Sequence, residues 1–283
     1  MTMQNRKNRA MEREPVVETT GPQGIEIEHL NLELGGKRLL DDVSLHVEAG
    51  KVTGLAGESG SGKSLTSYSI LQLYPEGSSV SGKIMFAGRN LLALDTEEIT
   101  EVRGRQIAFV FQDPSSSFHP MISILGQMTD HMRYHLHMNR QQAAERAQEL
   151  LDMVEIPDPH GALHKYPHQF SGGQLQRIAI ASALACNPKV IIADEPTTAL
   201  DVTVQAGILQ LLRDLCDRLG TTIILVTHDL GVMSALADNV AVMREGHIVE
   251  FGTRYQVLRE PKHPYTRSLI DALPMNMGGF DDE

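Results

Sequence analysis

The chain has 283 residues and a formal net charge of −11, from 25 Lys and Arg against 36 Asp and Glu. This acidic balance argues against a protein that coats nucleic-acid phosphates, and no nucleic-acid partner is expected. A hydrophobic fraction of 41% with 22% charged residues is typical of a folded chain and excludes wholesale disorder. The two cysteines, Cys186 and Cys216, exclude a disulfide framework and a four-cysteine zinc site, and they fit a reducing compartment.

The start of the chain and its longest apolar runs indicate where in the cell the protein is located. Residues 1–24 mix basic and acidic side chains without an apolar stretch, which predicts a flexible tail and no secretory signal. Val190–Ala193 and Ile223–Val226 are far shorter than the roughly 18–20 residues of a membrane helix. We therefore expect a cytoplasmic protein that other components anchor if it works at a membrane.

Short apolar segments in the first third predict strands. Ile25–Glu28 and Val43–Val47 alternate apolar and polar residues, as half-buried strands do. Val52–Ala56 is a small apolar strand that leads into a Gly/Ser loop and then a helix beginning at Lys63. Two further strands are expected at Ile84–Phe86 and Ile107–Phe111.

The middle of the chain, residues 113–186, is typical of an inserted helical subdomain. Apolar residues recur at helical spacing in a helix that begins near Arg140, and a second helix begins at Gly172. Prolines between the two helices, at positions 157, 159 and 167, interrupt the pattern.

Continuous apolar strands alternate with helices in the last third. Val190–Ala193 and Thr222–Thr227 flank a helix over Val202–Leu219 that ends at Gly220. This alternation predicts an α/β fold with a parallel sheet covered on both faces. Ala241–Met243 and Ile248–Phe251 predict a hairpin, and we count residues 25–283 as one domain.

The loop after the third strand carries a phosphate-binding pattern. It matches G-x-x-x-x-G-K-[ST] between a strand and a helix, which makes an accidental Gly/Ser connector a poor alternative. Glycines let backbone N–H groups converge on phosphate at a helix N-terminus. Lys63 would lie at the β- and γ-phosphates, and the Ser64 hydroxyl would bind Mg²⁺. The loop is Gly57, Glu58, Ser59, Gly60, Ser61, Gly62, Lys63 and Ser64.

Two carboxylates follow the apolar strand Val190–Ala193. The carboxyl ends of parallel strands meet at the sheet edge where ligands bind. We expect Asp194 to hold Mg²⁺ and Glu195 to polarise the attacking water, a role worth about 10²–10⁴-fold in rate. Acidic residues at the end of a strand before a proline are common, so this pattern indicates a nucleotide site only because the phosphate loop is also present.

A second helix start decides the class of P-loop protein. Ser171, Gly172, Gly173 and Gln174 open a helix with a serine N-cap and two glycines, which suits a second anion-binding end. At this point the chain resembles the ATP-binding cassette (ABC) ATPases, whose signature is Ser-Gly-Gly-Gln. The resemblance covers residues 25–272, with Phe170 where leucine is usual. Its other motifs follow in order: Gln112 (Q-loop), Asp194-Glu195 (Walker B), Ala199-Leu200-Asp201 (D-loop) and His228 (switch).

The resemblance implies an ABC core with a mostly parallel sheet, an antiparallel β subdomain and an inserted helical subdomain. It also implies a head-to-tail dimer in which ATP lies between one subunit's phosphate loop and its partner's Ser171–Gln174. His228 would hold the γ-phosphate and the water, Gln112 would sense Mg²⁺, and Asp201 would contact the opposite subunit. A routine hydrogen bond at His228 and an exposed polar strand end at Gln112 are the alternatives.

One position departs from the family. ABC ATPases usually stack adenine on an aromatic residue, and the corresponding position here is Leu34, with no aromatic residue between Ile25 and Ser67. Loss of a stack costs about 0.5–1.5 kcal/mol. We expect weak base discrimination and modest ATP affinity, which Leu34→Tyr should raise.

Three segments are similar to ATPases of peptide and nickel importers: Phe111–Met121, Ala193–Gln205 and Pro261–Pro274. The last of these lies in what the resemblance implies is the family's C-terminal segment, residues 251–283. The chain resembles the first of the two ATPases in such systems. This implies a second ATPase subunit (a heterodimer, with a homodimer left open), two transmembrane permease subunits, an extracytoplasmic solute-binding protein, and a place on the cytoplasmic face of the inner membrane. Many peptide-importing relatives carry a cysteine cluster near the C-terminus, and this chain has no cysteine after Cys216. We therefore favour nickel as the cargo, with peptides as the alternative.

Histidines and methionines gather between Met128 and Met138. His131 and His135 are four residues apart and could share a helix face, as metal ligands do. No third ligand is fixed by spacing, so we favour a polar, Met-lined surface of the helical subdomain that meets a membrane subunit.

Other classes fit less well. A soluble ABC ATPase of DNA repair or translation usually has two cassettes or a long coiled coil, and this chain has neither. A kinase or GTPase would not need Ser171–Gln174, and we find no guanine-reading Asn-Lys-x-Asp. Lys63, Glu195 and His228 argue against an inactive regulatory cassette.

Overall fold

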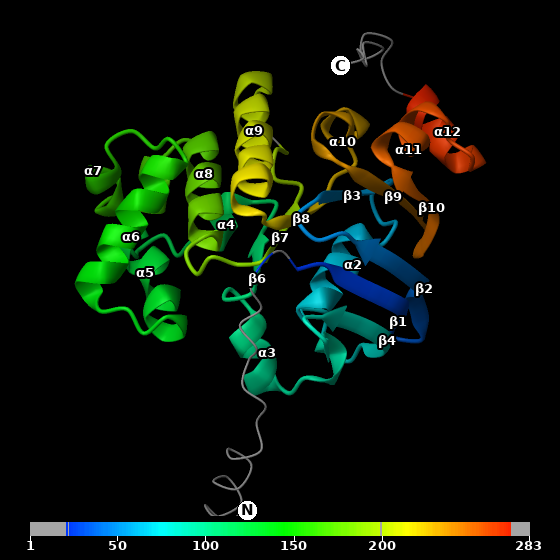
Figure 1. The fold of residues 1–283 in the computed structure, drawn as a ribbon, viewed down its shortest axis with the longest axis horizontal. Helices are drawn as coiled ribbons and strands as arrows, with labels where there is room; N and C mark the ends of the chain where they lie inside the picture. The colour runs from blue at the N-terminus through cyan, green and yellow to red at the C-terminus, as the bar shows by residue number, and fades with distance from the viewer. Residues whose placement is uncertain (1–20, 22, 199, 273–283) are drawn as a thin grey trace, which may run out of the picture.

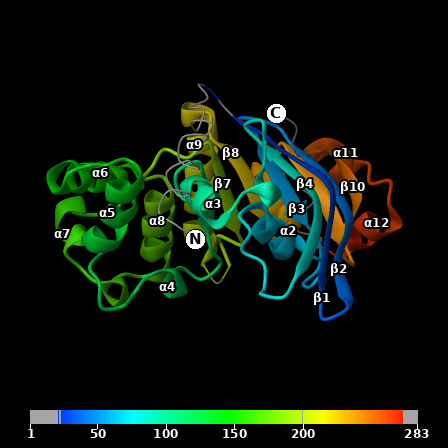
Figure 2. The same ribbon diagram turned by 90° about the horizontal axis from the view of Figure 1, so that it is seen from below.

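The computed structural model describes residues 21, 23–198 and 200–272. Most of the tail expected over residues 1–24, and the end of the segment expected over residues 251–283, lie outside this part. Within it, two β-sheets and a lateral group of helices form an elongated molecule (Figures 1 and 2). None of the described helices combines the length and the apolar character needed to cross a bilayer.

The larger sheet has, among the described residues, six strands in the order β10-β9-β3-β8-β7-β6. β9, β3, β8, β7 and β6 run parallel, and β10 is antiparallel to β9. β3, β7 and β8 are buried along their whole length, which explains their continuous apolar sequences. The predicted α/β fold is confirmed. The strands are β3 (Val52–Ala56), β6 (Ile107–Val110), β7 (Val190–Asp194), β8 (Thr222–Val226), β9 (Asn239–Arg244) and β10 (His247–Thr253).

An antiparallel sheet lies beside the first, in the order β2-β1-β4-β5. Helix α2 (Lys63–Ile70) lies between the two sheets, because it contacts β2 on one side and β7 and β8 on the other. Ile70, Ile84 and Ile192 belong to the same apolar cluster, which fixes α2 against both sheets. The strands are β1 (Ile25–Leu34), β2 (Lys37–Val47), β4 (Ser79–Phe86) and β5 (Arg89–Asn90).

The opposite face of the larger sheet is covered by α9 (Val202–Leu219) and α10 (Leu230–Leu236) (Figure 1). Along β7, Ile191 packs with the α9 side and Ile192 with the α2 side, as alternation in a strand requires. After β10 the chain forms α11 and α12, which lie next to α10. The remaining connections are η1 (Leu91–Ala93), α3 (Thr96–Val102), α11 (Arg254–Arg259) and α12 (Pro264–Asp271).

The helical subdomain projects to one side of the sheets (Figure 1, left). Its own core forms where α5, α6 and α8 pack together, with Ala143, Ala147 and Leu150 of α6 fully buried. The elements are α4 (Pro114–Ser117), α5 (Ile124–His135), α6 (Arg140–Met153), α7 (Pro159–Leu163), η2 (Pro167–Gln169) and α8 (Gly172–Ala183).

The histidine- and methionine-rich segment corrects one interpretation. We expected its methionines on a surface, but Met128 and Met132 are fully buried in the core of the helical subdomain. They follow Ile124 at four-residue intervals, so they lie on the face of α5 that packs against α6. His131 is also turned inward, with Nε2 3.0 Å from the carbonyl oxygen of Ser182, and burial lowers its pKa.

Candidate functional site

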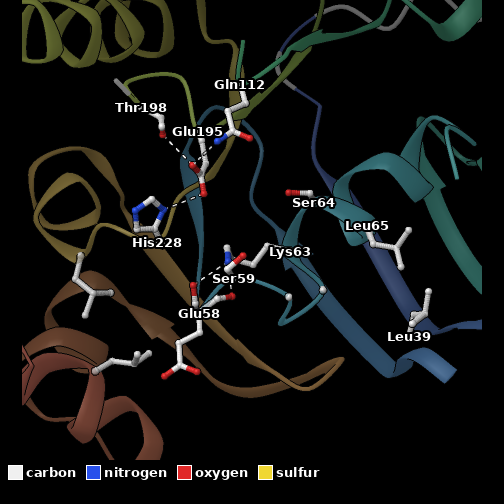
Figure 3. A pocket seen from close by; sticks show the side chains of 15 residues that line it. Leu39, Glu58, Ser59, Lys63, Ser64, Leu65, Gln112, Glu195, Thr198 and His228 are labelled. Carbon is white, nitrogen blue, oxygen red and sulfur yellow. Dashed lines mark hydrogen bonds and ion pairs between the residues drawn. The ribbon is translucent and has the colours of Figure 1, made fainter. Parts of the chain in front are cut away.

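A pocket of about 780 Å³ opens at the carboxyl ends of β3, β7 and β8. This is the sheet edge at which parallel α/β folds bind ligands. Its polar side chains come from four separate segments, and those of Gln112, Thr198 and His228 point towards Glu195 (Figure 3). The lining consists of Leu39, Gly57, Glu58, Ser59, Gly60, Gly62, Lys63, Ser64, Leu65, Gln112, Glu195, Thr198, His228, Leu230 and Leu269.

The phosphate loop turns sharply between β3 and α2. Gly57 has φ of 144°, and a Cβ there would lie 2.3 Å from the carbonyl oxygen of Met243, so glycine is required. Gly62 is the N-cap of α2 in a left-handed conformation and offers no side-chain cap to the first N–H groups. These N–H groups are therefore available to an anion.

Lys63 lies inside the loop and is 5% exposed. Its Nζ donates to the carbonyl oxygens of Gly57 and Glu58, both at 2.8 Å. Burial lowers the pKa of Lys63, although the carboxylates of Glu195 and Asp194 oppose this effect. The ammonium group is thus pre-positioned at the centre of the loop.

Ser64 lines the pocket and contacts the buried Asp194, which is outside the lining. The Ser64 hydroxyl donates to Asp194 Oδ1 at 3.1 Å, and Asp194 is 2% exposed. Burial raises the pKa of Asp194, while hydrogen bonds from Ser64 and Tyr68 favour its ionised form. Burial beside this carboxylate also raises the pKa of Tyr68 to about 12, so its hydroxyl keeps its proton and donates.

Glu195 receives hydrogen bonds from three directions. Gln112 Nε2 lies 2.9 Å and Thr198 Oγ1 2.8 Å from Oε2, and His228 Nδ1 lies 2.9 Å from Oε1. Figure 3 shows these side chains converging on the carboxylate from separate segments. The arrangement fixes the carboxylate at the mouth of the pocket.

The electrostatics of Glu195 follow from these partners. Burial tends to raise the pKa of Glu195, but hydrogen bonds from His228 and Thr198 outweigh it and hold the pKa below its usual value. Its φ of 46° lies in the left-handed region, a strained conformation for glutamate that costs about 1–3 kcal/mol. The hydrogen bonds keep an ionised carboxylate in this strained position.

Comparisons with known proteins agree with this geometry. A family profile described as ABC transporter matches residues 40–198, and one described as oligopeptide/dipeptide transporter, C-terminal region, matches residues 249–281. A probable peptide ABC transporter ATP-binding protein of Sinorhizobium fredii is 47% identical, covering 84% of this chain and 71% of that protein. The oligopeptide transport ATP-binding protein OppD of Bacillus subtilis is 46% identical, covering 88% of this chain and 70% of that protein.

Solved structures extend the comparison. A dimeric structure of the ATP-binding cassette MJ0796, in a post-hydrolysis state bound to ADP and Pi, has a TM-score of 0.72 at 30% identity. It covers 81% of this chain and 98% of that one. The chain belongs to the ABC transporter family. As an ABC ATPase it binds and hydrolyses ATP.

The ABC signature lies apart from this pocket. Ser171 is the N-cap of α8 and exchanges hydrogen bonds with Gln174, a capping box that holds the first turn. None of Ser171–Gln174 lines the pocket formed by the described residues. In this chain the Asp201 side chain caps α9 by accepting from the N–H of Val204 at 3.0 Å.

The apolar end of the ABC pocket differs from our expectation. Leu34, the residue at the expected stacking position, is absent from the lining, whereas Leu39 of β2 and Leu65 of α2 contribute to it (Figure 3). Leu34 pairs with Lys37 where β1 turns into β2. Because Leu34 does not line the pocket in this conformation, any effect of Leu34→Tyr on ATP binding would be indirect.

Sequence reasoning missed three side chains of the site. Thr198 follows Glu195 by one turn, and this spacing could have indicated the hydrogen bond. Tyr68 lies five residues beyond Lys63 on a helix whose orientation only the fold defines. Tyr265 accepts a hydrogen bond from the N–H of Glu58 across 207 positions, for which the sequence contains no signal.

Proposed function

We propose that this chain is the ATPase subunit of an importer for di- and oligopeptides and works in a head-to-tail dimer. The observation that carries the proposal is the separation of two anion-binding helix ends, α2 and α8, on one chain (Figures 1 and 2). A second subunit can bring its α8 end to the pocket. The relative solved with ADP and Pi is dimeric, which supports this arrangement.

The residues at the pocket floor fit Mg²⁺. Ser64 and Asp194 offer a hydroxyl and a carboxylate oxygen 3.1 Å apart, and Mg²⁺ prefers such ligands together with substrate phosphates. A cation would also favour the ionised form of the buried Asp194 carboxylate. The Gln112 amide oxygen would be a further ligand. Bound there, Mg²⁺ would neutralise charge on the β- and γ-phosphates.

The remaining roles follow from the side chains. Lys63 and the loop N–H groups would hold the phosphates, with the partner's Ser171–Gln174 closing the γ-phosphate side. Glu195, ionised at neutral pH, would orient the attacking water and take up its proton. Thr198 and Gln112 would fix the carboxylate, and His228 would hold the γ-phosphate and the water from the other side. Asp201 would contact the opposite subunit.

Mutation of the base tests the ATPase assignment. Glu195→Gln should lower ATP turnover by at least about a hundredfold and retain ATP in a stable dimer, because binding groups remain while the base is lost. Lys63→Ala should instead lose ATP binding. The measurements are phosphate release and dimer formation with ATP. Robust hydrolysis by Glu195→Gln in the assembled transporter would contradict the assignment.

The membrane setting follows by analogy with the peptide-transport relatives. We infer two permease subunits, a second ATPase subunit or a second copy of this chain, and a solute-binding protein outside. The ATPase would lie on the cytoplasmic face of the inner membrane. These partners would supply the membrane anchor.

Peptides are the better supported cargo. The C-terminal profile and the relatives are described as oligopeptide or peptide transport proteins, and nickel uptake stays a prediction from the sequence. Deletion of the gene should confer resistance to toxic peptides and leave nickel-dependent urease or hydrogenase activity unchanged. Loss of the nickel enzyme activity without peptide resistance would reverse the choice of cargo.

A further inference from the structure

The C-terminal segment reaches the phosphate loop through Tyr265. The backbone N–H of Glu58, the second residue of the loop, donates to the Tyr265 hydroxyl oxygen at 3.1 Å. Tyr265 lies in the first turn of α12 and is 7% exposed. A segment at the far end of the chain therefore supplies a hydrogen-bond partner to the loop.

The Glu58 residue is held from both ends. Its N–H is bound by Tyr265, and its carbonyl oxygen accepts from Lys63 Nζ at 2.8 Å. The same Nζ also binds the carbonyl oxygen of Gly57. The N–H group that the Tyr265 hydroxyl binds thus belongs to Glu58, one of the two residues whose carbonyl groups position the Lys63 ammonium group.

Tyr265 is itself fixed in place. The Arg244 guanidinium lies over its ring, 5.0 Å from the centroid, and Arg244 ends β9 of the larger sheet. The turn before α12 is anchored because Glu250 accepts from the N–H groups of Lys262 at 2.7 Å and His263 at 3.1 Å. Both contacts tie the start of α12 to the β9-β10 hairpin.

The same helix also contributes to the pocket wall. Leu269 lies four residues after Tyr265, one turn along α12, and it lines the pocket. Glu58 lines the pocket on the loop side. The hydroxyl of Tyr265 therefore lies beside the nucleotide pocket and not at a remote surface.

We propose that Tyr265 is a positioning residue for ATP binding: its hydroxyl holds the start of the phosphate loop in the conformation that presents Lys63 and the loop N–H groups to phosphate. The proposal rests on the assignment of this loop as the phosphate site. It gives the C-terminal segment a direct part in the affinity for nucleotide.

The consequence of removing the hydroxyl is specific. Tyr265→Phe keeps the ring that packs against Arg244 and leaves the Glu58 N–H without its acceptor. Without this hydrogen bond the loop of the free protein is less ordered. Nucleotide binding must then also order the loop, which makes the free energy of binding less favourable. We expect about a three- to tenfold rise in the Kd for ATP, as loss of one hydrogen bond predicts. The kcat at saturating ATP should be nearly unchanged.

The experiment uses the purified full chain and four measurements. ATP and ADP affinity, KM and kcat, the thermal midpoint without nucleotide, and hydrogen exchange at the Glu58 amide are compared for wild type and Tyr265→Phe. Tyr255→Phe on α11 is the matched control, because Tyr255 is 60% exposed. Tyr265→Phe should weaken binding of both nucleotides and speed exchange at Glu58, with the midpoint unchanged. Tyr255→Phe should behave as wild type.

Two results would overturn the proposal. One is wild-type affinity and wild-type exchange at Glu58 in Tyr265→Phe. The other is a loss of affinity that only accompanies a lower thermal midpoint, which indicates general destabilisation. Lys63→Ala separates this inference from the loop assignment: if Lys63→Ala abolishes binding while Tyr265→Phe has no effect, only the role of Tyr265 fails. Normal ATP binding by Lys63→Ala would remove the phosphate-site assignment and this proposal together.

Discussion

The Glu195 carboxylate is the group that we propose as the general base of this site. Its position is defined by Gln112, Thr198 and His228, which belong to three different segments. A general base must be both ionised and correctly oriented. Here the same hydrogen bonds perform both tasks, because they hold the carboxylate and lower its pKa.

Thr198→Val tests this double role. The variant loses one hydrogen bond to Oε2, worth about 1 kcal/mol or fivefold, and this loss should appear in kcat with little change in the KM for ATP. The Thr198 hydroxyl lowers the pKa of Glu195, so its removal raises that pKa. Since the ionised form is active, the acid limb of the kcat profile should move to higher pH.

The profile is measured for wild type, Thr198→Val and Thr198→Ser. Serine keeps the hydroxyl, so Thr198→Ser should restore both the rate and the position of the acid limb. Lys63, Asp194 and His228 also interact with Glu195, and they are the same in all three proteins. An acid limb that stays in place in Thr198→Val would show that the hydroxyl does not set the charge of Glu195.

At the scale of helices, two N-termini of this chain are built differently. α8 begins with Ser171, whose side chain caps the first turn, and Gln174 completes the capping box. α2 begins with Gly62, which provides no side-chain acceptor. A serine or aspartate cap typically stabilises a helix by about 1 kcal/mol relative to alanine. At α8 the Ser171 side chain occupies only the N–H of Gln174, whereas at α2 no side-chain cap occupies any of the first N–H groups. The start of α2 therefore lacks the stabilisation that a side-chain cap would provide, and its first N–H groups remain available to bind phosphate.

The elements that the sequence predicted share a physical cause. β3, β7 and β8 are buried on both faces, so their sequences are continuously apolar, and the phosphate loop has a chemistry that requires fixed residue types. These features depend on local constraints. The group of side chains that contact Glu195 was predicted only in part: the resemblance named Gln112 and His228 as site residues, and Thr198 was missed.

Long-range contacts could not be predicted in this way. The bond between Tyr265 and Glu58 depends on how α12 follows the β9-β10 hairpin back to the loop, and no local pattern encodes that path. The opposite error occurred at Met128 and Met132. Their four-residue spacing from Ile124 places them on one buried helix face, whereas we had interpreted them as part of a Met-lined surface that meets a membrane subunit.

At the scale of the molecule, the described pocket takes none of its lining from α8. Its described lining comes from the phosphate loop, the Q-loop, Walker B and the switch histidine, and α8 lies on the lateral subdomain (Figure 2). The proposed head-to-tail dimer would complete two such sites at once. Each site would then combine the loop of one subunit with Ser171 of the other.

This arrangement predicts complementation between two inactive variants. Lys63→Ala disables the loop, and Ser171→Arg blocks the signature helix. In a mixed dimer of this chain, one site carries both defects and the other carries neither. Random mixing should therefore restore about a quarter of the wild-type ATPase rate if the two sites act independently. The comparison is made where the wild-type chain alone is active. Full activity of Ser171→Arg alone, with no gain on mixing, would mean that each subunit hydrolyses ATP without its partner's signature helix.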